Sequence, residues 1–164
     1  MNKYYTGVGS RDTPLNILSI MTKFAKKLEE SGWILRSGGA EGADQAFELG
    51  TKTLKEIFLP WKNFQNNPSP HYKIPIEAFI KAEQIHPAWQ RCSQGAQKLH
   101  ARNIQQVLGK KLNEPSKFLI CWTKGGISRG GTATAINLAI DNGVKVINLG
   151  NEKHLQKILS FLNK

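Results

Sequence analysis

The chain of 164 residues is poor in cysteine and in long hydrophobic runs, and each shortage excludes a class of protein. Its two cysteines, Cys92 and Cys121, do not form a CxxC pair and lie in apolar contexts. This excludes a disulfide framework and a zinc motif, so we predict two reduced core thiols, no metal site and no cofactor. The longest apolar run, Phe118 to Trp122, is far shorter than the ~20 residues of a membrane span, and no signal-peptide core follows the polar start. We therefore expect a cytoplasmic protein without a membrane partner.

Acidic residues are also scarce, because 12 of them stand against 23 lysines and arginines. The formal net charge of +11 favours polyanionic partners. Hydrophobic residues make up 40% of the chain and charged residues 21%, as in ordinary globular proteins, which excludes wholesale disorder and low complexity. A length near the ~150 residues of an average domain predicts one domain over residues 1–164.

Short apolar segments alternate with helical patterns along nearly the whole chain. Strands are predicted at residues 4–8, 33–35, 56–60, 117–122 and 144–149. Helices are predicted at 14–32, from the end of the segment 37–44 to about residue 49, at 75–112 with a break at His86-Pro87, and at 131–142 and 154–162. An irregular surface loop is expected at 61–75. The alternation predicts an α/β fold, a Rossmann-like doubly wound domain with a mostly parallel sheet and helices on both faces.

Three loops rich in glycine and serine follow predicted strands, at residues 7–11, 37–44 and 125–132. In an open parallel sheet all three project from the carboxyl edge, where ligands bind and helix N-termini point partial positive charge. Glycine lets backbone N–H groups approach phosphate oxygens. Hydroxyl donors are available at Ser10, Ser37, Ser128 and Thr132. We expect a phosphate site at this edge, although any one such loop could serve only as a turn.

Neither of the common nucleotide motifs is complete. The loop at 125–132 approaches the Walker A pattern GxxxxGK[ST], but Gly131 occupies the lysine position, which argues against ATP hydrolysis. The segment 7–9 fails the dinucleotide-binding pattern, because Asp12 stands where its third glycine belongs.

A helical stretch rich in lysine and arginine follows residue 84. At 100° per residue Arg91, Lys98 and Arg102 fall within about 40° of one another, opposite a broad apolar face. Two interpretations stay open: a ligand-binding role for Arg102, or a solvated basic edge of an amphipathic helix. Aromatic side chains that could stack on a base are Trp61, Tyr72 and Trp122.

Catalytic chemistry has little support in the sequence, since no spaced triad, HExxH motif or carboxylate pair is visible. The candidate acids and bases are Glu41, Asp44 and Glu83, with His71 and His86 as helpers. Asp44 could instead cap the following helix, and Glu41 could lie in its first turn, where a carboxylate favours the helix dipole.

The glycine loops resemble a known superfamily. The segments GSR at 9–11, SGGAEGAD at 37–44 and GGTATA at 130–135 are similar to the Rossmann core shared by DprA/Smf DNA-processing proteins and LOG nucleotide hydrolases, the SLOG superfamily. The segments LHARN at 99–103, VLG at 107–109 and CWT at 121–123 are most similar to compact DprA-like proteins of bacteriophages and some bacteria. The resemblance implies a protein that acts in the bacterial cytoplasm. If the match is to the phage proteins, the chain is encoded by a phage and acts in the host cell. The resemblance also implies a homodimer or a higher homo-oligomer.

The resemblance also implies which residues bind phosphate: Gly9, Ser10, Arg11, Ser37, Gly38, Gly39, Gly130, Gly131 and Thr132. In LOG enzymes the motif PGGxGTxxE supplies a glutamate that helps to cleave the N-glycosidic bond of a nucleoside 5′-monophosphate, and Ala135 occupies that position here. In DprA proteins the corresponding region holds single-stranded DNA. A third branch of the superfamily binds ADP-ribose-derived signalling nucleotides.

The sequence therefore predicts a binding protein more than an enzyme. Its ligand is a nucleotide, a nucleotide-derived signal or the backbone of single-stranded DNA, held at the carboxyl edge of the sheet. Arg11 and Arg102 are expected to neutralise phosphate, and Asp44 to accept a ribose hydroxyl or to cap its helix. Two alternatives are a sponge that sequesters ADP-ribose-derived immune signals and a nucleoside 5′-monophosphate N-glycosidase of LOG type.

Overall fold

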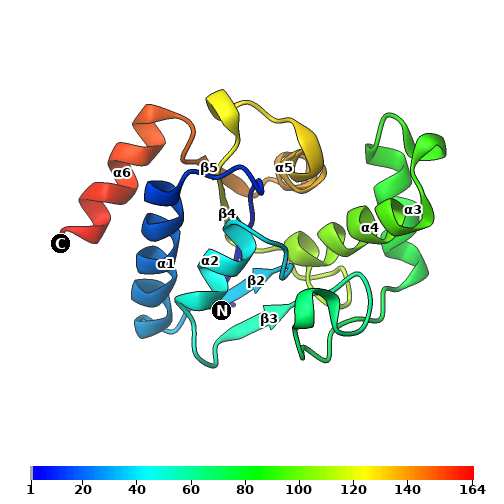
Figure 1. Ribbon diagram of the computed structural model, residues 1–164, viewed down its shortest axis with the longest axis horizontal. Helices are drawn as coiled ribbons and strands as arrows, with labels where there is room; N and C mark the ends of the chain where they lie inside the picture. The colour runs from blue at the N-terminus through cyan, green and yellow to red at the C-terminus, as the bar shows by residue number, and fades with distance from the viewer. Residues whose placement is uncertain (1) are drawn as a thin grey trace.

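A computed structural model describes residues 2–164 and contains a five-stranded sheet in which every pairing is parallel (Figure 1). The strands are β1 (Tyr4–Gly7), β2 (Ile34–Ser37), β3 (Lys55–Ile57), β4 (Phe118–Cys121) and β5 (Lys145–Asn148). Their order across the sheet is β3-β2-β1-β4-β5. This is the order of a doubly wound Rossmann-like sheet, so the predicted fold class is confirmed.

The described residues form six α-helices, five of which pack on the two faces of the sheet. The six helices are α1 (Leu15–Glu30), α2 (Ala43–Leu49), α3 (Ile76–Ile85), α4 (Gln94–Leu108), α5 (Ala133–Asp141) and α6 (Glu152–Leu162). Helices α1, α2 and α6 lie on one face, and α4 and α5 lie on the other, with α3 packed against both of these (Figure 1). Within residues 2–164 no helix has the length and apolar character that crossing a membrane requires.

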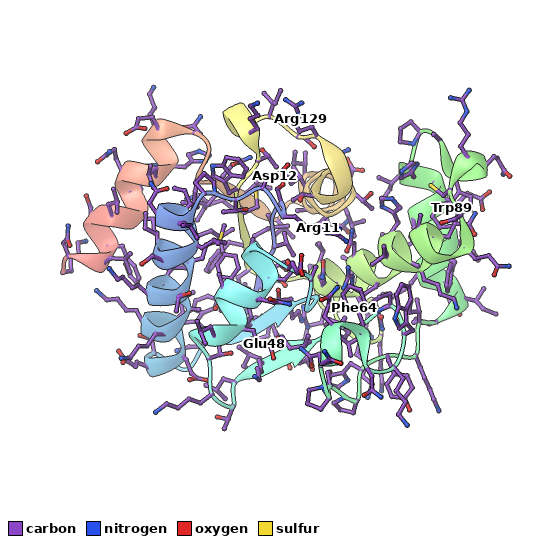
Figure 2. All side chains as sticks on the ribbon, viewed as in Figure 1. Arg11, Asp12, Glu48, Phe64, Trp89 and Arg129 are labelled. Carbon is purple, nitrogen blue, oxygen red and sulfur yellow. The ribbon has the colours of Figure 1, made fainter. Side chains whose placement is uncertain are left out.

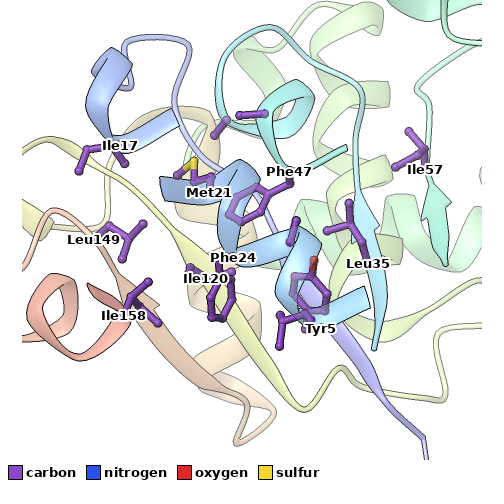
Figure 3. Packing of buried hydrophobic residues seen from close by; sticks show 14 of the residues in the cluster. Tyr5, Ile17, Met21, Phe24, Leu35, Phe47, Ile57, Ile120, Leu149 and Ile158 are labelled. Carbon is purple, nitrogen blue, oxygen red and sulfur yellow. The ribbon is translucent and has the colours of Figure 1, made fainter. Parts of the chain in front are cut away.

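The first face is held by an apolar cluster centred on α1 (Figure 3). The buried residues of α1 are Ile17, Met21, Phe24, Ala25 and Leu28, a spacing of three and four that forms one stripe along the helix. This stripe packs against Tyr5 of β1, Leu35 of β2 and Phe47 of α2, which are fully buried. Burial of each large side chain contributes about 1.5–3 kcal/mol to the free energy of folding, so this contact holds α1 in place on the sheet.

On the second face α4 and α5 pack against β1 and β4 through small and branched side chains. Cys121 of β4 is fully buried there, and burial raises the pKa of its thiol to about 12. The prediction of a core thiol is therefore confirmed for Cys121. It is wrong for Cys92, which is only partly buried, because it lies in the connection between α3 and α4 and not within a helix.

The break predicted at His86-Pro87 is present and separates α3 from α4. His86 has an extended backbone, as a residue before proline prefers, and α3 ends at Ile85. Helix α4 begins only after Ser93, whose hydroxyl oxygen accepts a hydrogen bond from Ala96 N at 3.1 Å. The connection of residues 86–93 therefore folds back beside α4.

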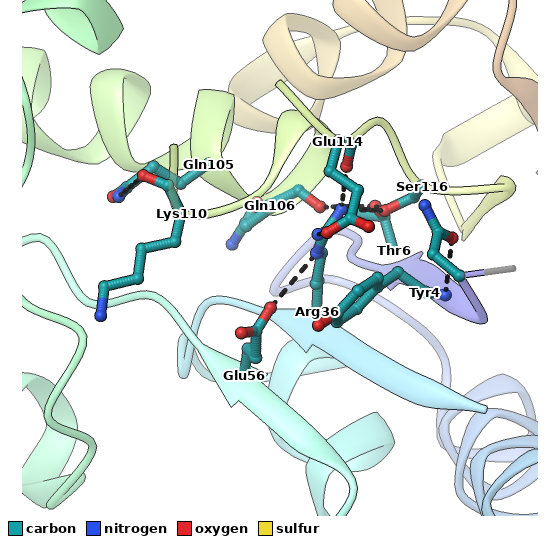
Figure 4. Close-up of polar contacts among 10 residues, drawn as sticks. Tyr4, Thr6, Arg36, Glu56, Gln105, Gln106, Lys110, Glu114 and Ser116 are labelled. Atoms are coloured by element: carbon teal, nitrogen blue, oxygen red, sulfur yellow. Dashed lines mark hydrogen bonds and ion pairs between the residues drawn. The ribbon is translucent and has the colours of Figure 1, made fainter. Parts of the chain in front are cut away.

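A buried arginine joins the strands to the chain that enters β4. Arg36 of β2 has only 1% of its surface exposed, and its Nε donates to Glu56 Oε1 at 3.3 Å (Figure 4). Its Nη1 donates to Glu114 O at 2.6 Å and to Ser116 Oγ at 3.2 Å. Its guanidinium also lies 3.8 Å from the centroid of the Tyr4 ring. Arg36 is therefore a structural cation, as its donors are used inside the fold.

Candidate functional site

A crevice opens where the winding of the sheet changes direction. After β1 the chain passes to α1 on one face, whereas after β4 it passes to α5 on the other. The two strands are neighbours, and beyond their ends Ser10 N donates to Trp122 O at 3.4 Å. A cavity of about 500 Å³ lies at this point. Both its volume and its position at the carboxyl ends of the strands are those of a small-molecule site in a doubly wound sheet.

The walls of the cavity come from five parts of the chain. They are the loop after β1, the loop before α2 with the first turn of that helix, the loop after β3, helix α4 and the segment from the end of β4 into α5. Figure 2 shows Arg11 and Asp12 on the loop after β1, Arg129 above them on the segment between β4 and α5, and Phe64 beside α4. Four basic side chains line the cavity, Arg11, Arg102, Lys124 and Arg129. The carboxylates that line it are Asp12 and Asp44, so positive charge dominates.

The structure brings most of the predicted site residues to this cavity. The predicted residues that line it are Gly9, Ser10, Arg11, Asp44, Arg102, Gly130, Gly131 and Thr132. The first and third glycine loops therefore converge, as their positions after β1 and β4 require. From the second loop the cavity receives Ala40 and Asp44 but none of the three residues at 37–39.

The residues Ser37, Gly38 and Gly39 serve the fold behind the cavity. The Ser37 hydroxyl donates to Gly7 O at 2.6 Å and ties β2 to β1. Gly38 O accepts a hydrogen bond from Arg102 Nη1, and a Cβ at Gly38 would collide with the side chains of Arg102 and Gln106. The first part of the second glycine loop, residues 37–39, thus packs against Arg102 and Gln106 and does not line the cavity.

Arg102 is buried, with 4% of its surface exposed, so of the two interpretations left open the solvated basic edge is wrong for this residue. Arg91 precedes α4 and does not share its helical register, which removes it from the same face. Besides Gly38 O, Arg102 Nη1 donates to Phe58 O at 3.1 Å, and its Nε donates to Asn103 Oδ1 at 3.0 Å. Desolvation lowers the pKa of Arg102 to about 10, although Asp44 opposes this, and the guanidinium stays charged at neutral pH.

Asp44 is a buried carboxylate in the first turn of α2. Desolvation raises its pKa to about 6, against the positive charge of Arg102, which lowers it. Its Oδ2 accepts a hydrogen bond from Ala40 N at 3.3 Å, while Gly42 occupies the N-cap position. Asp44 therefore closes the loop before the helix and is not the N-cap residue. Near neutral pH it presents mostly negative charge to the cavity.

Gln106 is a cavity residue that the sequence interpretation missed. It is 1% exposed, and neither Oε1 nor Nε2 of its amide has a hydrogen-bond partner in the described chain. A buried polar group without a partner costs about 1–3 kcal/mol, which a ligand with a matching donor or acceptor would recover. The available signal was its spacing, because Gln106 follows Arg102 by four residues and so lies on the same side of α4.

Gly131 leaves open space in the third loop. A Cβ at Gly131 would meet no atom within 4 Å, and its backbone is not in the left-handed region, so neither packing nor conformation demands glycine there. Gly130 has φ +67° and does require it. Asn103 Nδ2 donates to Gly131 O at 3.2 Å and holds the loop against α4.

No protein-family model and no curated protein matches this chain.

The remaining candidates divide between the cavity wall and the surface. Glu41 and Glu83 are exposed and do not line the cavity, so the geometry does not favour them as acid or base. Of the aromatic candidates, Trp122 lines the cavity, whereas Trp61 and Tyr72 do not. Phe64, in a short 3-10 turn of the 61–75 loop, lines it from the side of α4.

One group of metal-ligating side chains stands at the edge of the cavity. Among residues 2–164, His86, Cys92 and His100 place one ligand atom each within 4.8 Å of the other two. His100 also lines the cavity. Burial, together with the neighbouring His86 and Arg102, lowers the pKa of His100, so its ring is neutral at neutral pH. The group is separate from the glycine loops.

Proposed function

We propose that this chain binds a small phosphate-bearing ligand, a nucleotide or a nucleotide-derived signal of ADP-ribose type, in the cavity between β1 and β4. The observation that carries the proposal is the cavity itself, which is walled by two glycine-rich loops and lined by four basic side chains at the carboxyl edge of a doubly wound sheet. A volume of about 500 Å³ suits a ligand of nucleotide size. The proposal agrees with the resemblance to the SLOG superfamily.

The cavity offers separate groups for each part of such a ligand. Backbone N–H groups at Gly130 and Gly131, with Arg11 and Arg129, are suited to phosphate oxygens. The Asp44 carboxylate is suited to a ribose hydroxyl. The Trp122 ring lines the same cavity and offers a surface for a base. Each charge-assisted hydrogen bond contributes about 1.5–3 kcal/mol.

Binding, more than hydrolysis, is what the lining residues support. Ala135 lines the cavity at the position where LOG enzymes carry their glutamate, and a methyl group can neither donate nor accept a proton. A LOG-type N-glycosidase built on this chain would have to take its acid or base from Asp12, Asp44 or His100. The sequestering of an immune signal needs no such group, so the sponge function is compatible with this cavity.

Binding of single-stranded DNA is the second candidate, and the net charge of +11 favours it. A DNA backbone needs cations along an open surface, and exposed Arg91 and Lys98 lie outside the cavity. The two candidates therefore differ in whether cations outside the cavity contribute to affinity.

The test compares two arginines of equal charge. Isothermal titration with AMP, ADP and ADP-ribose is expected to give saturable binding of at least one of them, with one site per chain. Arg129→Ala should weaken that binding about tenfold or more, because it removes a charged hydrogen-bond donor from the cavity wall. Arg91→Ala removes the same charge outside the cavity and should leave the affinity within about twofold.

A third variant tests the space at the glycine loop. Gly131→Phe fits the backbone conformation and should keep the fold, but its ring enters the open space and should abolish binding. Equal losses for Arg129→Ala and Arg91→Ala, or full affinity in Gly131→Phe, would contradict binding in this cavity. Failure of all three nucleotides to bind would do the same.

A further inference from the structure

We propose that His86, Cys92 and His100 form a binding site for a divalent transition metal, Zn²⁺ foremost, at the edge of the cavity. The inference does not rest on the proposed nucleotide function, since none of the glycine-loop residues takes part in the cluster. It starts from the placement of three ligand atoms, each within 4.8 Å of the other two.

The fold, and not a sequence motif, assembles this cluster. His86 follows the end of α3, Cys92 lies in the connection, and His100 lies in the second turn of α4. Because the connection folds back along α4, the rings of His86 and His100 lie 4.4 Å apart between centroids. All three side chains are partly buried, which leaves them within reach of solvent ions. The spacings of six and eight residues match no familiar zinc pattern, so the sequence alone gave no sign of the cluster.

The donor set and its distances suit a tetrahedral metal. Two imidazoles and one thiolate are ligands that Zn²⁺ prefers. With Zn–N of about 2.0 Å and Zn–S of about 2.3 Å, tetrahedral ligands place the nitrogen and the sulfur about 3.5 Å apart. Cys92 Sγ and His86 Nε2 lie 3.8 Å apart, so only a small movement is needed. Binding would displace the thiol proton of Cys92 into solvent and leave a thiolate on the metal.

The hydrogen bonds around the cluster favour one histidine over the other. His100 Nδ1 lies 3.1 Å from Thr134 Oγ1, and donation to that hydroxyl oxygen leaves Nε2 unprotonated for a metal. His86 Nδ1 instead accepts from Ala88 N at 3.0 Å, which places the ring proton on Nε2. Metal binding through His86 Nε2 must break this bond. One net hydrogen bond changes an equilibrium by about tenfold at most, whereas structural zinc is bound many orders of magnitude more tightly.

The charges nearby make Cys92 the decisive ligand. Arg102, a cation two residues further along α4, lines the cavity together with His100 and disfavours further positive charge there. The thiolate of Cys92 is therefore the group that compensates the metal. Within the described chain the cluster supplies three ligands, so a fourth position is left for water or for an oxygen of a ligand in the adjoining cavity, whose wall includes His100.

The experiment uses the full chain, treated with a chelator and then titrated with Co²⁺ alone. A tetrahedral site with one thiolate should give a sulfur-to-cobalt charge-transfer absorption that saturates at one Co²⁺ per chain and disappears when Zn²⁺ is added. Cys92→Ser should abolish the charge-transfer absorption although Cys121 is retained. His100→Gln keeps the thiol and should weaken Co²⁺ binding about tenfold or more.

The control is His71→Gln, a histidine outside the cluster, which should bind Co²⁺ as the wild type does. Circular dichroism confirms that each variant is folded. The proposal is overturned if the wild type gives no saturable charge-transfer absorption, if that absorption persists in Cys92→Ser, or if His71→Gln and His100→Gln weaken binding equally. Nucleotide binding by the chelator-treated protein is measured separately, so failure of the metal site and failure of the nucleotide site are distinguishable.

Discussion

Asp44 and Arg102 are buried charges beside the same cavity, and burial works against both of them. Desolvation raises the pKa of Asp44 to about 6 and lowers that of Arg102 to about 10, although each charge favours the other. Keeping both groups charged therefore costs folding free energy. A ligand with a hydroxyl for Asp44 and a phosphate oxygen for Arg102 would recover part of that cost on binding.

The pKa of Asp44 predicts how this residue affects stability as pH changes. In the folded protein Asp44 binds its proton more tightly than in the unfolded chain, where the pKa is near 3.8. The free energy of unfolding that it contributes is therefore highest below that value and falls as pH rises through about 6. A shift of roughly two units corresponds to about 3 kcal/mol as an upper limit.

Asp44→Asn removes this dependence, because an amide has no proton to lose in this range. Urea unfolding of both proteins at about pH 4 and about pH 7 measures it. The stability of the variant relative to the wild type should rise by about 1–3 kcal/mol between the two pH values. Titrating groups that do not interact with Asp44 cancel in that comparison. A difference that does not change with pH would show that Asp44 is not desolvated.

At the scale of single residues, the sequence predicted which side chains line the cavity. It predicted their burial and their hydrogen-bond partners less well. Asp44 and Arg102 were named from their loop and helix positions, and both line the cavity. The burial of Arg102 was missed, because the helical wheel assumed one continuous helix through Arg91, whereas α4 begins at Gln94. Gln106 was missed because an unpartnered amide becomes visible only when the packing around it is known.

Among the elements, α1 and the chain before β3 are joined by a single carboxylate. Glu29, near the end of α1, accepts hydrogen bonds from the consecutive backbone N–H groups of Lys52, Thr53 and Leu54 at 2.8–3.0 Å. Partial burial opposes its ionisation, but these bonds outweigh that effect and lower the pKa of Glu29. The carboxylate therefore holds the connection between α2 and the edge strand.

Glu29→Gln should lower the free energy of unfolding by about 1–2 kcal/mol near neutral pH, because an amide accepts these bonds less strongly. The stabilisation is present above the unfolded pKa of about 4.5 and is lost as pH falls through the lower folded value, so the variant should approach the wild type in acid. Thermal unfolding of the variant and the wild type, near neutral pH and in acid below the unfolded pKa, measures this difference in stability. Glu30→Gln, at the exposed neighbouring residue, is the control and should change stability little. Equal effects of the two variants would disprove the role of Glu29.

The order of strands and helices was predictable from the sequence, because each strand includes or adjoins a short apolar run between helical patterns. Their ends were less predictable. The third strand was expected to reach Pro60 but ends at Ile57, since Phe58 instead forms an isolated bridge with His71 in the following loop. Residues 37–39 of the second glycine loop were expected at the ligand, yet Gly38 contacts Arg102 behind the cavity, a tertiary contact that no local pattern contains.

For the whole molecule, the sheet brings distant loops to one place while the charge is spread more widely. The cavity gathers four of the 23 lysines and arginines, so most of the net charge of +11 lies elsewhere. Large apolar side chains are also exposed, including Leu15 in α1 and Ile76 in α3. The homo-oligomer implied by the resemblance to the SLOG superfamily stays a prediction, which light scattering on the purified protein measures directly.

The salt dependence of binding distinguishes the two proposed ligand classes. A single-stranded oligonucleotide held by cations across the surface loses affinity with a slope of about −0.7 per neutralised phosphate in a plot of log K against log salt concentration. A nucleotide in the cavity meets at most the four basic side chains there and carries few phosphates, so its slope should be shallow. Affinities for ADP-ribose and for an oligonucleotide, measured between about 50 and 200 mM salt, give both slopes.

We expect tight, weakly salt-dependent binding of the nucleotide and weaker, steeply salt-dependent binding of the oligonucleotide. If instead the oligonucleotide binds more tightly and Arg91→Ala weakens it as much as Arg129→Ala does, the exposed cations carry the function and the DNA-binding candidate replaces the nucleotide proposal.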